Sequence, residues 1–127
     1  MYSFTDILLV EAVREAGWHG VRVRIYRDGE EYEREQAQAR RHRSATQALR
    51  GEAHIRIRVK PPSRDYMHLK QLCVDGRLLR TGSANWSPSG EKREDDDADY
   101  SSDPNAIERF VRDFEALWNR SDNIVVQ

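Results

Sequence analysis

Residues 66–86 decide the fold around them, and they read Tyr66-Met-His-Leu-Lys-Gln-Leu-Cys-Val-Asp-Gly-Arg-Leu-Leu-Arg-Thr-Gly-Ser-Ala-Asn-Trp86. Positions 66–74 alternate enough between apolar and polar side chains to predict a β-strand. Asp75-Gly76 is a strong signal for a two-residue type I′ turn, because both central positions of that turn need a positive φ. Residues 77–82 then form the returning strand. The stretch therefore predicts a hairpin whose second strand ends beside the start of the first.

This hairpin gathers a reactive set of side chains. A period of two residues places His68 and Lys70 on the same face of the first strand, and the turn brings Ser83 and Asn85 back toward them. Lys70 and Asn85 can hold the non-bridging oxygens of a phosphodiester, and Ser83 can add a hydroxyl or backbone donor. A histidine can act as nucleophile or as general acid and base near neutral pH. This chemistry needs no cluster of metal ligands.

Either residue of the pair His68 and Lys70, taken alone, is better read as an ordinary strand residue beside a hairpin. The full constellation favours the functional reading, because each added residue at a fixed separation lowers the chance of a coincidental match. The constellation consists of His68, Lys70, Asp75, Gly82, Ser83 and Asn85.

In order and separation these residues resemble the HKD motif of the phospholipase D superfamily. The segment Tyr2-Ser3-Phe4-Thr5-Asp6 resembles the start of the single-motif bacterial endonucleases of that superfamily. The acidic pair Asp96-Asp97 and a final helix over residues 104–119 fall where the closing elements of those enzymes fall. The resemblance covers nearly the whole chain and is weakest over residues 28–50.

The resemblance implies an α/β fold, a mixed β-sheet flanked by helices, built as one phospholipase D-like domain over residues 1–127. It also implies a strand that runs into residues 2–5 from upstream, where this chain begins. Members of the superfamily use two motifs per active site, and this chain contains one H-x-K sequence. The resemblance therefore predicts a two-fold homodimer that shares one active site, because an isologous interface brings each residue near the axis to its own copy.

The same resemblance assigns roles to the motif residues. His68 of one subunit attacks phosphorus and forms a phosphohistidine, and His68 of the partner subunit protonates the leaving oxygen. Lys70, Asn85 and Ser83 support the phosphoryl oxygens. Asp96 orients a histidine, and Asp75 organises the hairpin turn. The resemblance implies neither a metal ion nor another cofactor.

The charge distribution indicates where a polyanion would lie. The net charge is −1, so no overall excess of positive charge points to nucleic acid. Residues 54–80 nevertheless hold seven Lys and Arg against two acids, whereas residues 91–103 hold seven acids against Lys92 and Arg93. A basic groove attracts a polyanion, so Arg64 and Arg80 are candidate substrate-binding residues beside the hairpin. Each arginine taken singly is as well explained by a solvated strand face.

The rest of the chain predicts the elements of an α/β domain. Thr5 or Asp6 caps a helix that ends near Ala16 and Gly17. A partly exposed helical segment with little apolar surface follows over residues 30–50, and the residues after Asp97 make a poor strand. The expected strands are 21–26 and 54–59, the short helix is 44–49, and the last helix has an apolar face made by Ile107, Phe110, Val111, Phe114, Leu117 and Trp118.

Three functions remain open from the sequence. The first is a metal-independent phosphodiesterase that cleaves nucleic acid, DNA in particular. The second is a phospholipase D-type phospholipid hydrolase, although the sequence shows no amphipathic membrane-binding helix and predicts no stable membrane association. The third is a nucleic-acid-binding module without turnover. Met1 is followed by no signal peptide, so the chain as it stands is expected in the cytoplasm; a longer natural start would allow a periplasmic or secreted protein.

Overall fold

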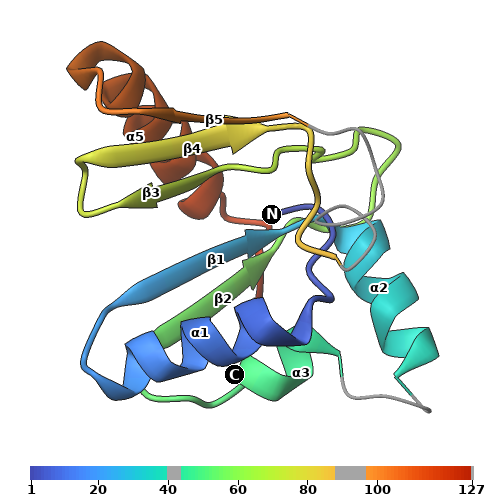
Figure 1. The fold of residues 1–127 in the computed structure, drawn as a ribbon. Coiled ribbons are helices and arrows are strands. Elements are labelled where there is room, and N and C mark those ends of the chain that lie inside the picture. The colour runs from blue at the N-terminus through green and yellow to red at the C-terminus, as the bar shows by residue number, and fades with distance from the viewer. Residues whose placement is uncertain (40–43, 88–96, 127) are drawn as a thin grey trace.

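The computed structural model describes residues 1–39, 44–87 and 97–126. In chain order the elements are α1 (Ile7–Trp18), β1 (Val23–Arg27), α2 (Gly29–Gln38), α3 (Ala45–Leu49), β2 (Ile55–Val59), β3 (Leu72–Val74), β4 (Leu78–Gly82), β5 (Ala98–Ser101), α5 (Pro104–Trp118) and β6 (Ile124–Val126). The strands form two three-stranded sheets, in the orders β1-β2-β6 and β3-β4-β5. In Figure 1 the N-terminus lies between these sheets.

The first sheet is mixed, as the sequence predicts for part of the fold. Strands β1 and β2 run parallel, joined through α2 and α3, and β6 runs antiparallel to β2. Asp28 and Ser44 cap the two connecting helices by accepting hydrogen bonds from backbone N–H groups of the first turn. Parallel strands need a crossover connection of this kind. The predicted strands and the short helix at 44–49 are confirmed, with ends shifted by one or two residues.

The second sheet contains the hairpin. Asp75 and Gly76 have φ of 51° and 61°, as the predicted turn requires. The ladder pairs Val74 with Leu78, so residues 75–77 separate the strands, one more than a two-residue turn leaves. Strand β5 pairs antiparallel with β4, so the poor strand signal after Asp97 does correspond to a strand, a short one.

The expected strand over 66–74 is wrong at its first six positions, because only Leu72–Val74 joins the sheet. Backbone groups before Leu72 are bound by other parts of the chain. Met67 donates its N–H to Asp28 Oδ2 at 2.8 Å, and the carbonyl of Leu69 accepts from Tyr2 N–H at 3.1 Å. Long-range partners therefore hold this extended stretch in place of a neighbouring strand.

The N-terminal segment contacts both sheets. The Met1 amino group donates to the Tyr26 carbonyl at 2.7 Å, on the β1 side. On the other side Phe4 forms an isolated parallel bridge with Trp86 and packs edge-on against its ring. The expected single mixed sheet is thus two sheets with residues 1–6 between them, and the α/β class is confirmed.

Two apolar clusters hold the elements together. Phe4, Val10, Leu49, Ile55 and Ile57 lie in one cluster, under α1 and α3. The second cluster contains Tyr26, Met67 and Trp118 and is covered by α5, which Figure 1 shows against the β3-β4-β5 sheet. The predicted last helix is confirmed, with Asp103 as its cap and Pro104 in its first turn.

Helix α1 differs from expectation in two ways. It continues through Gly17 to Trp18, and Gly17 packs closely on Ala53 and Ile55, where a Cβ would lie 3.0 Å from the Ala53 carbonyl oxygen. Its apolar side chains are also only partly buried. Ile7 and Leu8 are 70% and 68% exposed, whereas Val10 is buried.

Candidate active site

The imidazole of His68 and the ammonium of Lys70 are in direct contact. Lys70 Nζ lies 2.8 Å from Nδ1 and 2.7 Å from Nε2 of His68, and it donates to the His68 carbonyl at 3.0 Å. An ammonium can only donate, and which ring nitrogen accepts from it depends on the tautomer of the imidazole. Lys70 is buried and His68 is exposed. The pair therefore presents an accessible imidazole next to a buried positive charge.

A buried arginine holds the two halves of the hairpin motif. Arg80 of β4 is 7% exposed, and its Nη1 donates to the carbonyl of Lys70 at 3.2 Å and to that of Ala84 at 3.5 Å. Lys70 is the last residue of the H-x-K sequence, and Ala84 directly precedes Asn85. One guanidinium thus fixes the backbone at Lys70 against the loop that contains Asn85.

The loop after β4 is fixed by strand β5. Ser83 N–H donates to the Asp97 carbonyl, and Ser83 Oγ accepts from Asp97 N–H, both at 3.0 Å. Gly82 permits this approach. Its φ is 150°, and a Cβ there would lie 2.0 Å from the Asp97 carbonyl oxygen. Only glycine fits a backbone contact this close.

The Asn85 side chain retains an unused hydrogen-bonding group. Its Oδ1 is buried and has no hydrogen-bond partner within the described ranges. The oxygen and nitrogen of an amide are assigned rather than distinguished, so the unused atom is either an acceptor or, after a flip of the amide, a donor. A buried polar atom without a partner is costly unless a ligand or another chain completes it.

The remaining predicted site residues are Asp75, Arg64 and Asp96. Asp75 is exposed at the hairpin turn, at the opposite end of β4 from Ser83, in keeping with a role in the turn. Arg64 is exposed in the loop before the motif. Asp96 lies outside the described residues. Within the described residues no group of three or more His, Cys, Asp or Glu side chains could hold a metal ion.

Tyr2 is a neighbour of the site that the motif does not contain. Its ring packs edge-on against the His68 imidazole, with ring centroids 4.6 Å apart. In the sequence, Tyr2 stands out only as part of the segment 2–6 that resembles the start of the related endonucleases. No spacing rule relates it to His68, so no local signal could have found this contact.

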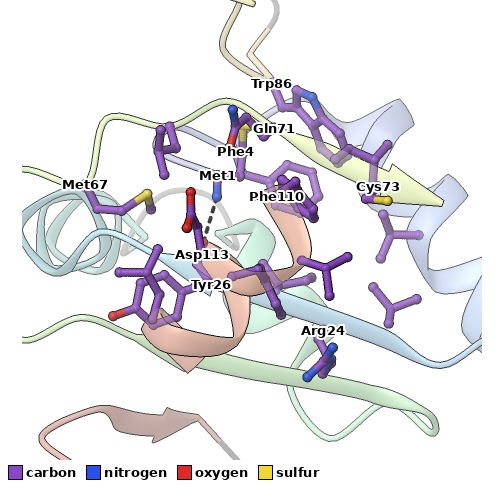
Figure 2. Close-up of a pocket in the computed structure, with 18 of the residues that line it drawn as sticks. Met1, Phe4, Arg24, Tyr26, Met67, Gln71, Cys73, Trp86, Phe110 and Asp113 are labelled. Carbon is purple, nitrogen blue, oxygen red and sulfur yellow. Dashed lines mark hydrogen bonds between the residues drawn. The ribbon is translucent and has the colours of Figure 1, made fainter. Parts of the chain in front are cut away.

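An apolar cavity of about 350 Å³ lies beside the motif, between β1 and β3 (Figure 2). Met1, Phe4, Trp86 and Phe110 contribute to its wall, and the dashed line marks the Met1–Tyr26 hydrogen bond. Neither His68 nor Lys70 lines this cavity. The exposed imidazole is therefore reached from the surface.

Comparison with known proteins agrees with this geometry. The family described as "Cardiolipin synthase, PLD-like domain" matches residues 1–118. A mitochondrial cardiolipin hydrolase of Chlamydomonas reinhardtii is 29% identical over 119 residues, which are 94% of this chain and 49% of that protein. The chain thus spans about half the length of this curated relative.

Two solved structures have the same fold. Nuc, a phospholipase D family member from Salmonella typhimurium, gives a TM-score of 0.77 at 23% identity, covering 99% of this chain and 78% of that one. NucT from Helicobacter pylori gives 0.84 at 18% identity, covering 98% and 78%. The chain belongs to the PLD-like domain family, within the phospholipase D superfamily.

Proposed function

We propose that this chain is a phosphodiesterase that hydrolyses DNA without a metal ion, through a phosphohistidine at His68. The observation that carries the proposal is the contact between Lys70 Nζ and the exposed His68 imidazole. The lysine supplies positive charge beside the imidazole, where phosphoryl oxygens would bind. Asn85 is the second ligand for those oxygens, to which its amide N–H groups can donate.

The reaction proceeds in two displacements. As Lys70 Nζ turns from the imidazole to a phosphoryl oxygen, a ring nitrogen of His68 attacks phosphorus and an N–P bond forms. The P–O bond to the leaving group breaks as that oxygen receives a proton from His68 of the partner subunit. Water then attacks the phosphohistidine and gives its proton to His68 of the partner subunit. The N–P bond breaks, which restores both histidines. Lys70 and Asn85 stabilise the charge that develops on the phosphoryl oxygens in each step.

This mechanism requires two copies of the motif at one phosphorus atom. Residues 1–127 supply one copy as a single domain, so we propose a two-fold homodimer with the motifs facing across the axis. An isologous interface brings the two motifs together, because His68 near the two-fold axis faces His68 of the partner subunit. Asp96, next to the Asp97 backbone that binds Ser83, stays the candidate for orienting a histidine.

The choice of DNA rests on the charge around the site. Residues 54–80 hold seven Lys and Arg against two acids, Arg64 lies exposed in the loop before the motif, and a polyanion gains from such charge. A phospholipid headgroup is the second candidate, because the Chlamydomonas relative is named a cardiolipin hydrolase. No helix within the described ranges is long and apolar enough to cross a membrane. Both substrates present a phosphodiester to the same side chains.

A comparison of substrates tests the proposal. Wild type and His68→Ala are incubated in excess EDTA with plasmid DNA, RNA and vesicles containing cardiolipin, and the mass of each protein in solution is measured. We expect plasmid cleavage by a wild-type dimer and none by His68→Ala. Hydrolysis of cardiolipin alone would replace DNA with a lipid as the substrate. A folded dimer that binds DNA and cleaves none of the three would instead be a binding module.

A further inference from the structure

The Tyr2 ring contacts both reactive side chains of the motif. Its centroid lies 4.6 Å from that of the His68 imidazole, with 63° between the ring planes, so the contact is edge to face. Lys70 Nζ lies 5.3 Å from the centroid of the same ring, within range of a cation–π interaction. One aromatic ring thus limits the positions that the imidazole and the ammonium can adopt.

The backbone of Tyr2 is fixed from two sides. Its N–H donates to the carbonyl of Leu69, the residue between His68 and Lys70, at 3.1 Å. Its carbonyl accepts from Arg27 Nη2 at 3.0 Å. These two backbone hydrogen bonds hold Tyr2 beside residues 68–70 independently of its side chain.

The arginine that binds Tyr2 is itself part of a buried network. Arg27 is fully buried, pairs with Glu35 of α2 at 2.5 Å and donates to Thr46 Oγ1 of α3 at 2.8 Å. It also donates from Nε to the Met1 carbonyl. An unpaired charge at this depth would be very costly, so the pair resists rearrangement. The segment that carries Tyr2 is thereby attached to a rigid part of the fold.

The hydroxyl connects Tyr2 to helix α2. A side-chain hydrogen bond with Tyr2, together with the charge of Glu31, raises the pKa of Arg34 above its ordinary value. Arg34 Nη1 donates to Glu31 at 2.7 Å. The Tyr2 hydroxyl therefore lies beside Arg34 of α2.

We propose that Tyr2 is a positioning residue of the active site, whose ring holds the His68 imidazole in line for attack and keeps the Lys70 ammonium beside it. The inference rests on the proposed hydrolysis at His68 and adds to it a residue outside the motif. His68 is exposed, so few other contacts restrict its rotamers. A displacement of about 1 Å at a reacting group can lower the rate about 100-fold.

Two substitutions separate the ring from the hydroxyl. Tyr2→Leu removes the ring and should lower kcat about 10- to 100-fold, with KM changed less than about threefold, because the substrate contacts stay in place. Tyr2→Phe keeps the ring and should retain kcat within about threefold. Tyr100→Leu is the control, since Tyr100 lies 68% exposed on β5. Wild-type kcat in Tyr2→Leu, or an equal loss in Tyr2→Phe, would overturn the assignment of this role to the ring.

A second measurement reads the geometry without turnover. Histidine NMR signals report ring currents from a neighbouring aromatic ring, and His19 and His54 serve as exposed references in the same spectrum. We expect a nuclear Overhauser contact between the Tyr2 ring and the His68 imidazole in wild type, and a shift of the His68 signal alone in Tyr2→Leu. Absence of the wild-type contact would overturn the inference even if Tyr2→Leu failed to fold. A wild type that cleaves no substrate but shows the contact would contradict only the proposed function.

Discussion

Lys70 Nζ lies 2.7 Å from Nε2 of His68 and 3.0 Å from the carbonyl oxygen of the same histidine. The buried lysine therefore contacts both the ring and the backbone of the residue proposed as nucleophile. A side chain in this position can neutralise the charge on a phosphoryl oxygen that binds beside the imidazole.

Replacement of this lysine should remove most turnover. Lys70→Met retains the length of the buried chain and removes the charge, and we expect kcat to fall at least about 100-fold, the usual effect of losing an oxyanion ligand. Lys60→Met is the control, because Lys60 donates to Ser63 in the loop before the motif and has no contact with the imidazole. Initial rates on the preferred substrate give the comparison. A Lys70→Met enzyme with more than half of the wild-type kcat would contradict the assigned role.

Arg80 and Arg64 should affect different kinetic constants. Arg80→Met leaves the carbonyls of Lys70 and Ala84 without their donor, so we expect a lower kcat and a loss of about 1–3 kcal/mol in the free energy of unfolding. Arg64→Met removes an exposed charge and should raise KM and weaken its dependence on salt. Kinetics at several salt concentrations distinguish them. If Arg80→Met raised KM alone, Arg80 would contact the substrate directly.

Two glycines with positive φ should differ in their tolerance of a methyl group. Gly82→Ala places Cβ 2.0 Å from the Asp97 carbonyl, which separates β4 from β5, and we expect a loss of about 2–4 kcal/mol in unfolding free energy together with activity. Gly76→Ala meets no atom within 4 Å and carries only the backbone cost of about 1–2 kcal/mol. Urea denaturation measures both. Equal effects would show that the Asp97 contact does not constrain position 82.

The ion pair between α5 and β1 should stabilise the fold only above acidic pH. A hydrogen bond from Arg24 lowers the pKa of Glu115 in the folded state, so its contribution is present above the unfolded pKa and disappears as pH falls through the folded one. Both side chains are about 40% exposed, which limits the effect. Glu115→Gln should cost less than about 1 kcal/mol at pH 7 and nothing at low pH or in high salt.

The matched control for that pair lies on the same helix. Asp113 contacts Arg112 with both side chains 68% exposed, so Asp113→Asn should leave the unfolding free energy unchanged across the pH range. Denaturation at pH 7 and at acidic pH gives the comparison. A Glu115→Gln cost that persisted at low pH would point to lost packing rather than lost charge.

Local signals predicted the parts of the fold that local interactions determine. Asp75-Gly76 specified positive φ in the turn, and Asp103-Pro104 specified the start of α5. Residues 66–71 could not be predicted correctly, because their partners are Tyr2 and Asp28 rather than an adjacent strand. Alternation of charge and apolar side chains likewise failed to show that Arg80 is buried among backbone carbonyls.

In the candidate site, too, the sequence predicted what local order determines and missed what tertiary contacts determine. The order of His68, Lys70, Ser83 and Asn85 was sufficient to expect them in one hairpin. The contact between Tyr2 and His68 depends on the path of the whole N-terminal segment, which the buried Arg27 fixes. Contacts of this kind arise from tertiary packing and have no periodic signature in the sequence.

The most direct test of the central claim is to trap the covalent intermediate. An oligonucleotide with one internal labelled phosphate is mixed with enzyme in excess EDTA, quenched with alkali within one turnover, and the protein is digested and mapped. We predict an acid-labile, alkali-stable label on the peptide that contains His68, and no label in His68→Ala. Undiminished cleavage by His68→Ala would contradict the account, because a phosphohistidine at His68 could not then lie on the reaction path.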